Sequence, residues 1–261
     1  MGHIQYEVAD GVATVTIDRP EKRNAMTYSV LRDFTQAIWR ASDDDAARVV
    51  IVTGAGGAFC AGTDLAELDE TPEGERGSAA RIDDPRASQP WPLASCPKPV
   101  IAAVDGAAVG MGAEFATQCD VRIASDRARF GWVFVQRGLV PDTGAGSFLL
   151  PRLVGPTAAL RLLLSGELID AAEAERIGFV SEVVAPDDLA GAARAEAERY
   201  LGSSPFAVAR TKQLVYEAMA GERSAHLLRT GAALAECFSS EDHAEGVRAF
   251  LERRPAGFTG R

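Results

Sequence analysis

The sequence predicts an α/β fold built around a parallel sheet, followed by a helical region at the C-terminal end. Three observations support this prediction. Short apolar runs of strand length recur at 49–53, 100–104 and 121–124. Segments with helical spacing lie between strands, an alternation that favours crossover connections and therefore parallel neighbours. From Asp170 onward, the pattern becomes mostly helical.

The first elements are a hairpin and a helix. Residues 4–7 and 12–17 alternate around Asp10-Gly11, a pair typical of hairpin turns. Residues 28–41 then have apolar side chains at helical spacing, and Thr27 stands where an N-cap is expected. The chain therefore begins with two antiparallel strands and one long helix.

The later segments divide the chain in two. Residues 70–90 are polar and rich in proline, glycine and charge, which predicts a mobile or partly disordered lid. Asp170-Ala-Ala-Glu173 has the spacing of a capping box. Gly202-Ser-Ser-Pro205 is a break, so residues 1–202 are expected to form the core and residues 203–261 a helical appendage.

Composition excludes several classes of function. The chain has 261 residues, 47% of them hydrophobic, and a formal net charge of -10, which argues against nonspecific nucleic-acid binding. The four cysteines and three histidines are scattered, so we expect reduced, buried thiols and no metal site. No apolar run has the length of a signal segment or membrane span, which favours a cytoplasmic protein without membrane contact.

Two glycine loops indicate what chemistry the protein could perform. Ala58-Phe-Cys-Ala-Gly-Thr-Asp-Leu65 and Gly110-Met-Gly-Ala-Glu114 each follow an apolar strand, and the second loop opens a predicted helix. Backbone N–H groups at such a helix start are unpaired and favour negative charge. Two such donors beside the carboxylate of Glu114 would suit enolate chemistry, which needs an oxyanion site and a proton carrier.

Simpler interpretations exist for the same residues. A dinucleotide fingerprint would need a third glycine where Phe115 stands, and Ser147 lacks the surroundings of a hydrolase nucleophile. Glu114 could merely stabilise a helix dipole, and Asp142 could be the N-cap of a helix at 145–153.

Several motifs, in the same order, make the chain resemble the crotonase superfamily of enoyl-CoA hydratases and isomerases. The resemblance covers nearly the whole chain and rests on these segments: Arg19-Pro-Glu-Lys-Arg-Asn-Ala25, Ala58–Leu65, Lys98-Pro-Val-Ile-Ala-Ala-Val-Asp-Gly106, Gly110–Glu114, Cys119-Asp-Val-Arg-Ile-Ala124, Leu164-Ser-Gly166 and Phe250-Leu-Glu-Arg-Arg-Pro255. It implies a ββα spiral core with an acyl-CoA site in residues 1–202, and a C-terminal helical trimerisation region in residues 203–261.

The resemblance also implies the site residues. Asp142 and Glu114 would be catalytic, and the backbone N–H groups of Thr63 and Met111 would form the oxyanion hole. No tightly bound cofactor is expected, since coenzyme A arrives as part of the substrate. The residues expected to contact the acyl-CoA thioester are Arg23, Ala25, Ala61, Gly62, Asp64, Leu65, Gly110, Phe134 and Phe258.

Two departures from the family pattern bear on the reaction. Hydratases of the superfamily hold a water between two glutamates, and Phe134 stands where the second glutamate belongs. Asp142 is typical of double-bond isomerases, and the run 130–155 looks closest to the epoxyphenylacetyl-CoA isomerases, although these usually lack the Glu114 carboxylate. Met111 replaces the usual glycine, but only its backbone N–H is required.

Three hypotheses follow for the function. The first is an isomerase that shifts a double bond of an enoyl-CoA thioester through an enolate. The second is a hydratase in which Glu114 and Asp142 together hold the water. The third is an acyl-CoA-binding protein without catalysis, against which the two retained carboxylates count.

The resemblance further implies a homotrimer or a pair of trimers. The predicted helices at 207–219 and 225–238 carry much apolar surface for a small appendage, and exposed apolar patches commonly mark interfaces. The alternative is that these helices fold back on their own core. In a trimer, Phe258 and Arg261 would reach the adenine or phosphate region of a neighbour's ligand.

Overall fold

The main sheet confirms the predicted hairpin and parallel strands. The computed structural model describes residues 2–66 and 91–261. The first two strands pair antiparallel, with Ile4 opposite Ile17, and the remaining pairs in this sheet are parallel. The spatial order is β1 (Ile4–Ala9), β2 (Val12–Ile17), β3 (Val49–Gly54), β4 (Val100–Val104), β6 (Val121–Ser125), β9 (Glu182–Val184).

Helices cover both faces of this sheet. Val50 and Val52 face the larger core, where α1 (Tyr28–Asp43) packs, whereas Ile51 faces α9 (Leu189–Leu201). This alternation follows from the two-residue period of a strand. Thr27 caps α1 as predicted, because its side chain accepts a hydrogen bond from the Val30 amide at 3.2 Å.

A second, three-stranded sheet carries the helix with the candidate carboxylate. It consists of β5 (Ala107–Val109), β7 (Arg129–Gly131) and β8 (Ile169–Asp170). The helix α4 (Met111–Gln118) begins two residues after β5, as the glycine motif predicts. The shorter helices of the core are η1 (Pro20–Lys22), α3 (Pro92–Ser95), η4 (Val133–Arg137), α5 (Ala145–Phe148), α6 (Leu150–Val154), α7 (Pro156–Ser165), α8 (Ala171–Arg176) and η5 (Pro186–Asp188).

The predicted helix at 145–153 is wrong in detail. It is divided into α5 and α6, because Pro151 has no N–H to donate to the Ser147 carbonyl. The alternative role of Asp142 as its N-cap is also wrong, since Gly144 occupies that position without a side-chain cap.

At α8, the Asp170 side chain accepts from the Glu173 amide at 2.8 Å, so half of the capping box is present. The Glu173 carboxylate instead pairs with Arg161 and Arg176.

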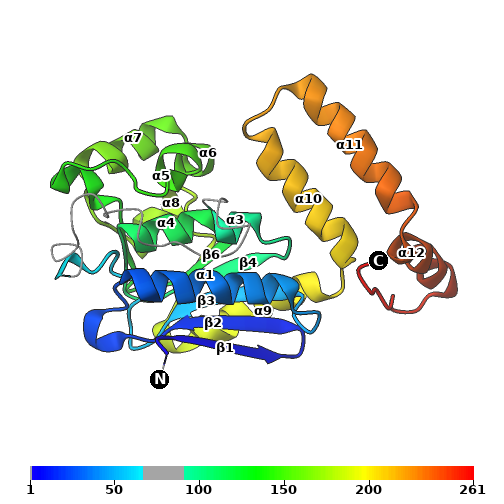
Figure 1. Cartoon of the computed structure of the whole chain (residues 1–261), viewed down its shortest axis with the longest axis horizontal. Helices are drawn as coiled ribbons and strands as arrows, with labels where there is room; N and C mark the ends of the chain where they lie inside the picture. Colours follow the sequence, from blue (N-terminus) through cyan, green and yellow to red (C-terminus); the bar gives the residue numbers. More distant parts are fainter. Residues whose placement is uncertain (1, 67–90) are drawn as a thin grey trace.

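The C-terminal helices extend from the core, and α10 attaches them to it (Figure 1). They are α10 (Pro205–Ala218), α11 (Arg223–Phe238) and α12 (Glu241–Glu252), and they begin after the predicted break. The Lys212 ammonium donates to the Asp120 carboxylate at 2.7 Å and to two backbone carbonyls of the core. The Tyr216 hydroxyl donates to the same carboxylate at 2.9 Å. These bonds fix α10 against α3, the residue pair before β4 and the turn between α4 and β6.

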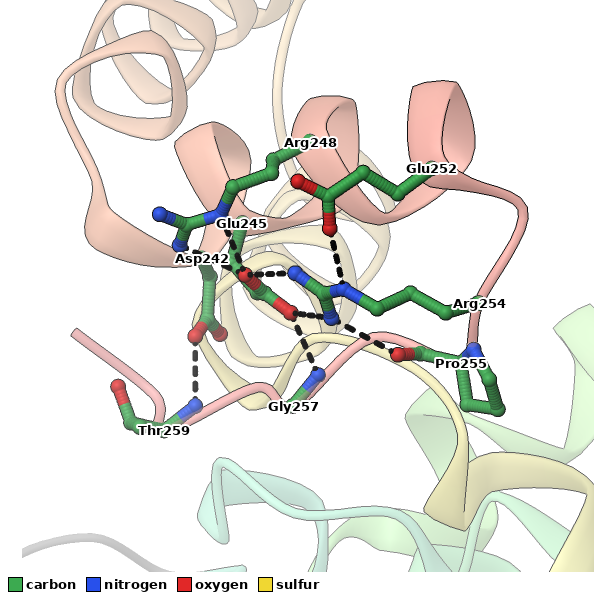
Figure 2. A network of polar contacts seen from close by, with 8 residues as sticks. All are labelled: Asp242, Glu245, Arg248, Glu252, Arg254, Pro255, Gly257 and Thr259. Atoms are coloured by element: carbon green, nitrogen blue, oxygen red, sulfur yellow. Dashed lines mark hydrogen bonds and ion pairs between the residues drawn. The ribbon is translucent and has the colours of Figure 1, made fainter.

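Polar contacts fold the C-terminal tail back along α12 (Figure 2). The buried Asp242 carboxylate accepts from the Thr259 amide at 2.7 Å and from the Ser204 hydroxyl at 2.6 Å. Arg254 pairs with Glu245, whose carboxylate also accepts from the Gly257 amide at 2.9 Å. The tail therefore belongs to the helical appendage and lies next to the start of α10.

Other sequence expectations have mixed outcomes. Cys60, Cys96 and Cys119 are buried, as predicted, and Cys237 is partly exposed. None of the helices in the described ranges is long and apolar enough to cross a membrane. The predicted lid at 70–90 lies outside the described residues.

Candidate active site

The two glycine loops meet through backbone hydrogen bonds. The Cys60 amide donates to the Ala107 carbonyl at 2.8 Å, and the Cys60 carbonyl accepts from the Val109 amide at 3.0 Å. On the other side of the same loop, the Ala61 amide donates to the Arg23 carbonyl at 3.0 Å. The loop that precedes Asp64 is thus fixed between the N-terminal turn and β5.

This arrangement leaves the two predicted oxyanion donors on adjacent segments. The Gly62 carbonyl and the Asp64 amide both bond to Met26, so the Thr63 amide between them points to the opposite side. Met111 is the first residue of α4, where the N–H groups have no partner within the helix. A β-carbon built on Gly62 would lie 3.5 Å from the Met111 nitrogen, which shows how closely the two loops approach.

Gly112 allows this approach. A β-carbon at that position would lie 2.1 Å from the Cys60 carbonyl oxygen, a distance that no packed side chain can adopt. The obstacle is backbone, so it cannot rotate away. The second glycine of the motif therefore holds the start of α4 against the loop that carries Thr63.

Glu114 lies in the first turn of α4 and is completely buried. Its Oε1 accepts a hydrogen bond from the Gly146 amide at 2.8 Å, and its Oε2 accepts one from the Thr143 hydroxyl at 2.5 Å. Burial raises the pKa of Glu114 to about 7, although both hydrogen bonds lower it. A carboxyl group with this pKa can exchange a proton near neutral pH.

Asp142 acts on the same carboxyl group. The hydroxyl of Thr143, the residue after Asp142, bonds to Glu114, so the backbone at Asp142 lies near that carboxylate, and the negative charge of Asp142 raises the pKa of Glu114. The residue keeps an exposed surface, yet desolvation of its carboxyl group by the surrounding protein raises its own pKa. The site thus contains one rigidly held carboxylate and one accessible carboxylate.

Aromatic residues line the region around these groups. Phe134 lies on η4 and is 7% exposed within the main core. The completely buried Trp132 ring lies next to Gly146. A β-carbon built on Gly146 would lie 2.9 Å from this ring and 2.3 Å from Glu114 Oε1. This apolar cover accounts for the desolvation of Glu114.

The predicted binding residues fall into two groups. Arg23, Ala61 and Gly62 lie in the backbone contacts described above, and Ala25 adjoins them. The Gly110 amide donates to the Gly131 carbonyl of β7 at 2.8 Å. Asp64 is bound to Arg19 at 2.7 Å, a contact that lowers the pKa of Asp64, while Leu65 is 51% exposed. Phe258 is separate from this group, because it lies on the tail against Gly246 of α12.

Sequence reasoning did not find the groups that hold Glu114. Thr143 and Gly146 bond to its carboxylate from 29 and 32 residues away along the chain, and Trp132 borders Gly146. Their only local signal is that Thr143 directly follows Asp142. A single sequence contains no pattern that predicts such long-range contacts, because they form only when the chain folds.

The chain thus has an α/β fold in which two glycine loops meet beside the buried carboxylate of Glu114. A sequence model described as Enoyl-CoA hydratase/isomerase matches residues 7–261. The chain belongs to this family, the crotonase family, and the expected fold class is confirmed.

Individual relatives agree with this assignment. The chain is 38% identical to a "Probable enoyl-CoA hydratase" of Rhodobacter capsulatus over 99% of this chain and 98% of that protein. It is also 38% identical to the "Short-chain-enoyl-CoA hydratase" of Clostridium acetobutylicum, over 100% and 99%. The crystal structure of an enoyl-CoA hydratase from Bacillus anthracis matches with a TM-score of 0.91 and 30% identity, covering 99% of this chain and 100% of that chain.

Proposed function

We propose that this protein is an isomerase that shifts a double bond of an enoyl-CoA thioester. The observation that carries the proposal is that Thr143, directly after Asp142, bonds to Glu114 on α4, whose first residue lies against the loop that contains Thr63. Phe134 supports it, since an aromatic ring cannot orient or deprotonate the water that a second glutamate would hold.

The mechanism uses the backbone donors first. The thioester oxygen accepts hydrogen bonds from the Thr63 and Met111 amides, each worth roughly 3 kcal/mol in the transition state. Asp142 removes a proton from carbon, and the electron pair of the broken C–H bond enters the dienolate. Asp142 then returns the proton at another carbon, so the double bond moves. Glu114 assists as a second acid or base, or holds a substrate group.

No other component is needed for this reaction. Coenzyme A enters as part of the substrate, and we propose no tightly bound cofactor. The remaining residues proposed to contact the thioester are those of the loop 61–65 together with Arg23, Ala25 and Gly110. A cytoplasmic enzyme without a nucleic-acid partner is part of the same proposal, in keeping with its net charge of -10.

Hydration of a 2-enoyl-CoA is the second candidate. The relatives named above are called enoyl-CoA hydratases, and these names favour hydration over isomerisation. In this alternative, Glu114 and Asp142 would hold the water together, with Asp142 in place of the missing second glutamate.

Crotonyl-CoA distinguishes the two candidates. We expect weak hydration of crotonyl-CoA and faster isomerisation of a 3-enoyl-CoA, because Phe134 removes one of the two groups that would hold the water. The measurement is kcat/KM for both substrates with the same enzyme preparation. Hydration turnover of hundreds per second, toward the top of the usual enzyme range, would establish the hydratase instead.

Assembly into a trimer, or a pair of trimers, is proposed from the C-terminal helices. Leu228 and Phe238 on α11 are 78% and 62% exposed, and Phe250 on α12 is 83% exposed. In the part of the chain that the structure describes, Lys212 and Tyr216 fix α10 to the core, while these side chains of α11 and α12 remain exposed. This exposure disfavours the alternative in which the helices fold back on their own core. Phe258 and Arg261 would then reach a ligand in a neighbouring subunit.

Light scattering at micromolar concentration tests the assembly. We expect a mass of three or six subunits, since a second copy would cover the exposed apolar side chains. Replacing Leu228 and Phe250 with glutamate should lower the mass, whereas replacing exposed polar Glu222 with glutamine should not. A wild-type mass of 27.6 kDa, that of one chain, would contradict the proposal.

A further inference from the structure

Building on the proposed function, we propose that Thr143 is a positioning residue, held by Trp91, that fixes Glu114 as a correctly oriented carboxylate. Thr143 lies between the accessible Asp142 and Gly144, which precedes α5. It touches Glu114 through its side chain and Trp91 through its backbone. The proposal deepens the role of the same site and adds two residues to it.

The direction of the Thr143 hydrogen bond is set by a second contact. The Ala145 amide donates to Thr143 Oγ1 at 3.3 Å, so this oxygen already acts as an acceptor. The single hydroxyl proton is then free to donate to Glu114 Oε2, 2.5 Å away. Because Oε1 also accepts from the Gly146 amide, the surroundings of both carboxyl oxygens favour the ionised form.

Trp91 holds the backbone of the same loop. Its indole Nε1 donates to the Thr143 carbonyl at 2.8 Å, and its ring packs on Phe148 with centroids 5.3 Å apart. Trp91 is the N-cap residue of α3, 52 residues from Thr143. The carbonyl of Thr143 is thus tied to one part of the core while its hydroxyl is tied to α4.

Besides Thr143, the backbone amides of Gly146 and Ala145 lower the pKa of Glu114, whereas the other described groups around it act in the opposite direction or not at all. Burial and the charge of Asp142 both favour the protonated form of Glu114. Cys60, on the loop beneath α4, stays neutral because burial raises its pKa to about 12, and the same cause raises the pKa of Cys96, beside α3. Arg122 donates to carbonyls at the far end of α4. Within residues 2–66 and 91–261, the Thr143 hydroxyl is therefore the side-chain donor that opposes the protonation of Glu114.

Thr143→Val removes the hydroxyl and keeps a β-branched side chain of similar shape, while Thr143→Ser keeps the hydroxyl. The direct readout is a 13C NMR titration of glutamate-labelled protein, with the Glu114 resonance identified by its loss in Glu114→Gln. We expect the pKa of Glu114 to rise by about one unit in Thr143→Val and to stay near the wild-type value in Thr143→Ser.

Activity gives a second readout. The acidic limb of the kcat/KM profile should move to higher pH in Thr143→Val, so that isomerisation falls about tenfold at pH 6.5 but less than threefold at pH 9. Trp91→Phe keeps the ring and loses the indole donor, and we expect a shift in the same direction. Thr143→Ser should follow the wild-type profile.

The proposed role of Thr143 and the proposed isomerase function can be refuted independently of each other. An unchanged Glu114 titration and pH profile in Thr143→Val would overturn the role of Thr143, whatever reaction the wild type performs. A loss of activity that is equal at every pH, with no change in titration, would equally overturn it, because it would show a merely structural effect. If the wild type does not isomerise 3-enoyl-CoA but the titration shifts as expected, the proposed function fails and the positioning role stands.

Discussion

Replacing Asp142 with asparagine is expected to lower isomerisation turnover by at least two orders of magnitude. Asparagine keeps the shape of the side chain but cannot accept and return a proton. The fold should be retained, because Asp142 is exposed and does not cap α5. Steady-state kinetics with a 3-enoyl-CoA would measure the loss, and circular dichroism would confirm the fold.

A charge control separates this effect from general electrostatics. Asp187 is an exposed aspartate on η5, and Asp187→Asn should leave turnover within about twofold of the wild type, as expected for a surface change away from the site. Removing the Asp142 charge should also lower the pKa of Glu114, since that charge raises it. Any residual activity in Asp142→Asn should therefore have its acidic limb at lower pH. Near-full activity in this variant would refute the role of Asp142.

Met111→Pro should lower kcat by about a hundredfold or more, because proline deletes the backbone N–H that is proposed to bind the thioester oxygen. Met111 is the first residue of α4, a position where proline fits a helix without loss of an internal hydrogen bond. The chain itself begins α10 with Pro205 and α7 with Pro156. Met111→Pro should therefore lower kcat much more than it lowers the stability of the fold.

Met111→Leu is the matched control. It preserves the amide and an apolar side chain of similar volume, which packs against the main core. Kinetics close to the wild type in Met111→Leu and a low kcat in Met111→Pro, with similar melting temperatures, would support the oxyanion hole. Equal kinetics in the two variants would show that the Met111 amide does not take part.

Sequence patterns were sufficient where a feature is local. Period-two alternation predicts the hairpin, helical spacing predicts α1 with its Thr27 cap, and short apolar runs predict the parallel strands β3, β4 and β6; the structure contains all of them. The glycine motif likewise predicted that residues 110–115 open a helix with Glu114 in its first turn, and α4 begins at Met111. These features depend on neighbouring residues, so one sequence specifies them.

The features that were missed depend on contacts between distant residues. Strands β5, β7, β8 and β9 contain two or three residues each, too few for a period to be recognised. The bond from Thr143 to Glu114 spans 29 residues, and the bond from Trp91 to Thr143 spans 52. The resemblance to crotonases predicted the two carboxylates, but the environment that tunes Glu114 arises only when α4, α5 and α3 come together.

The product formed from a 3-enoyl-CoA in water enriched in oxygen-18 tests the central claim most directly. Mass spectrometry distinguishes an isomer, whose mass equals that of the substrate, from a hydrate, which carries the heavy oxygen. We predict a 2-enoyl-CoA of unchanged mass as the first product of the wild type, and its loss in Asp142→Asn. A labelled hydroxyacyl-CoA as the main product at the earliest times, or an unchanged yield of isomer in Asp142→Asn, would contradict the account.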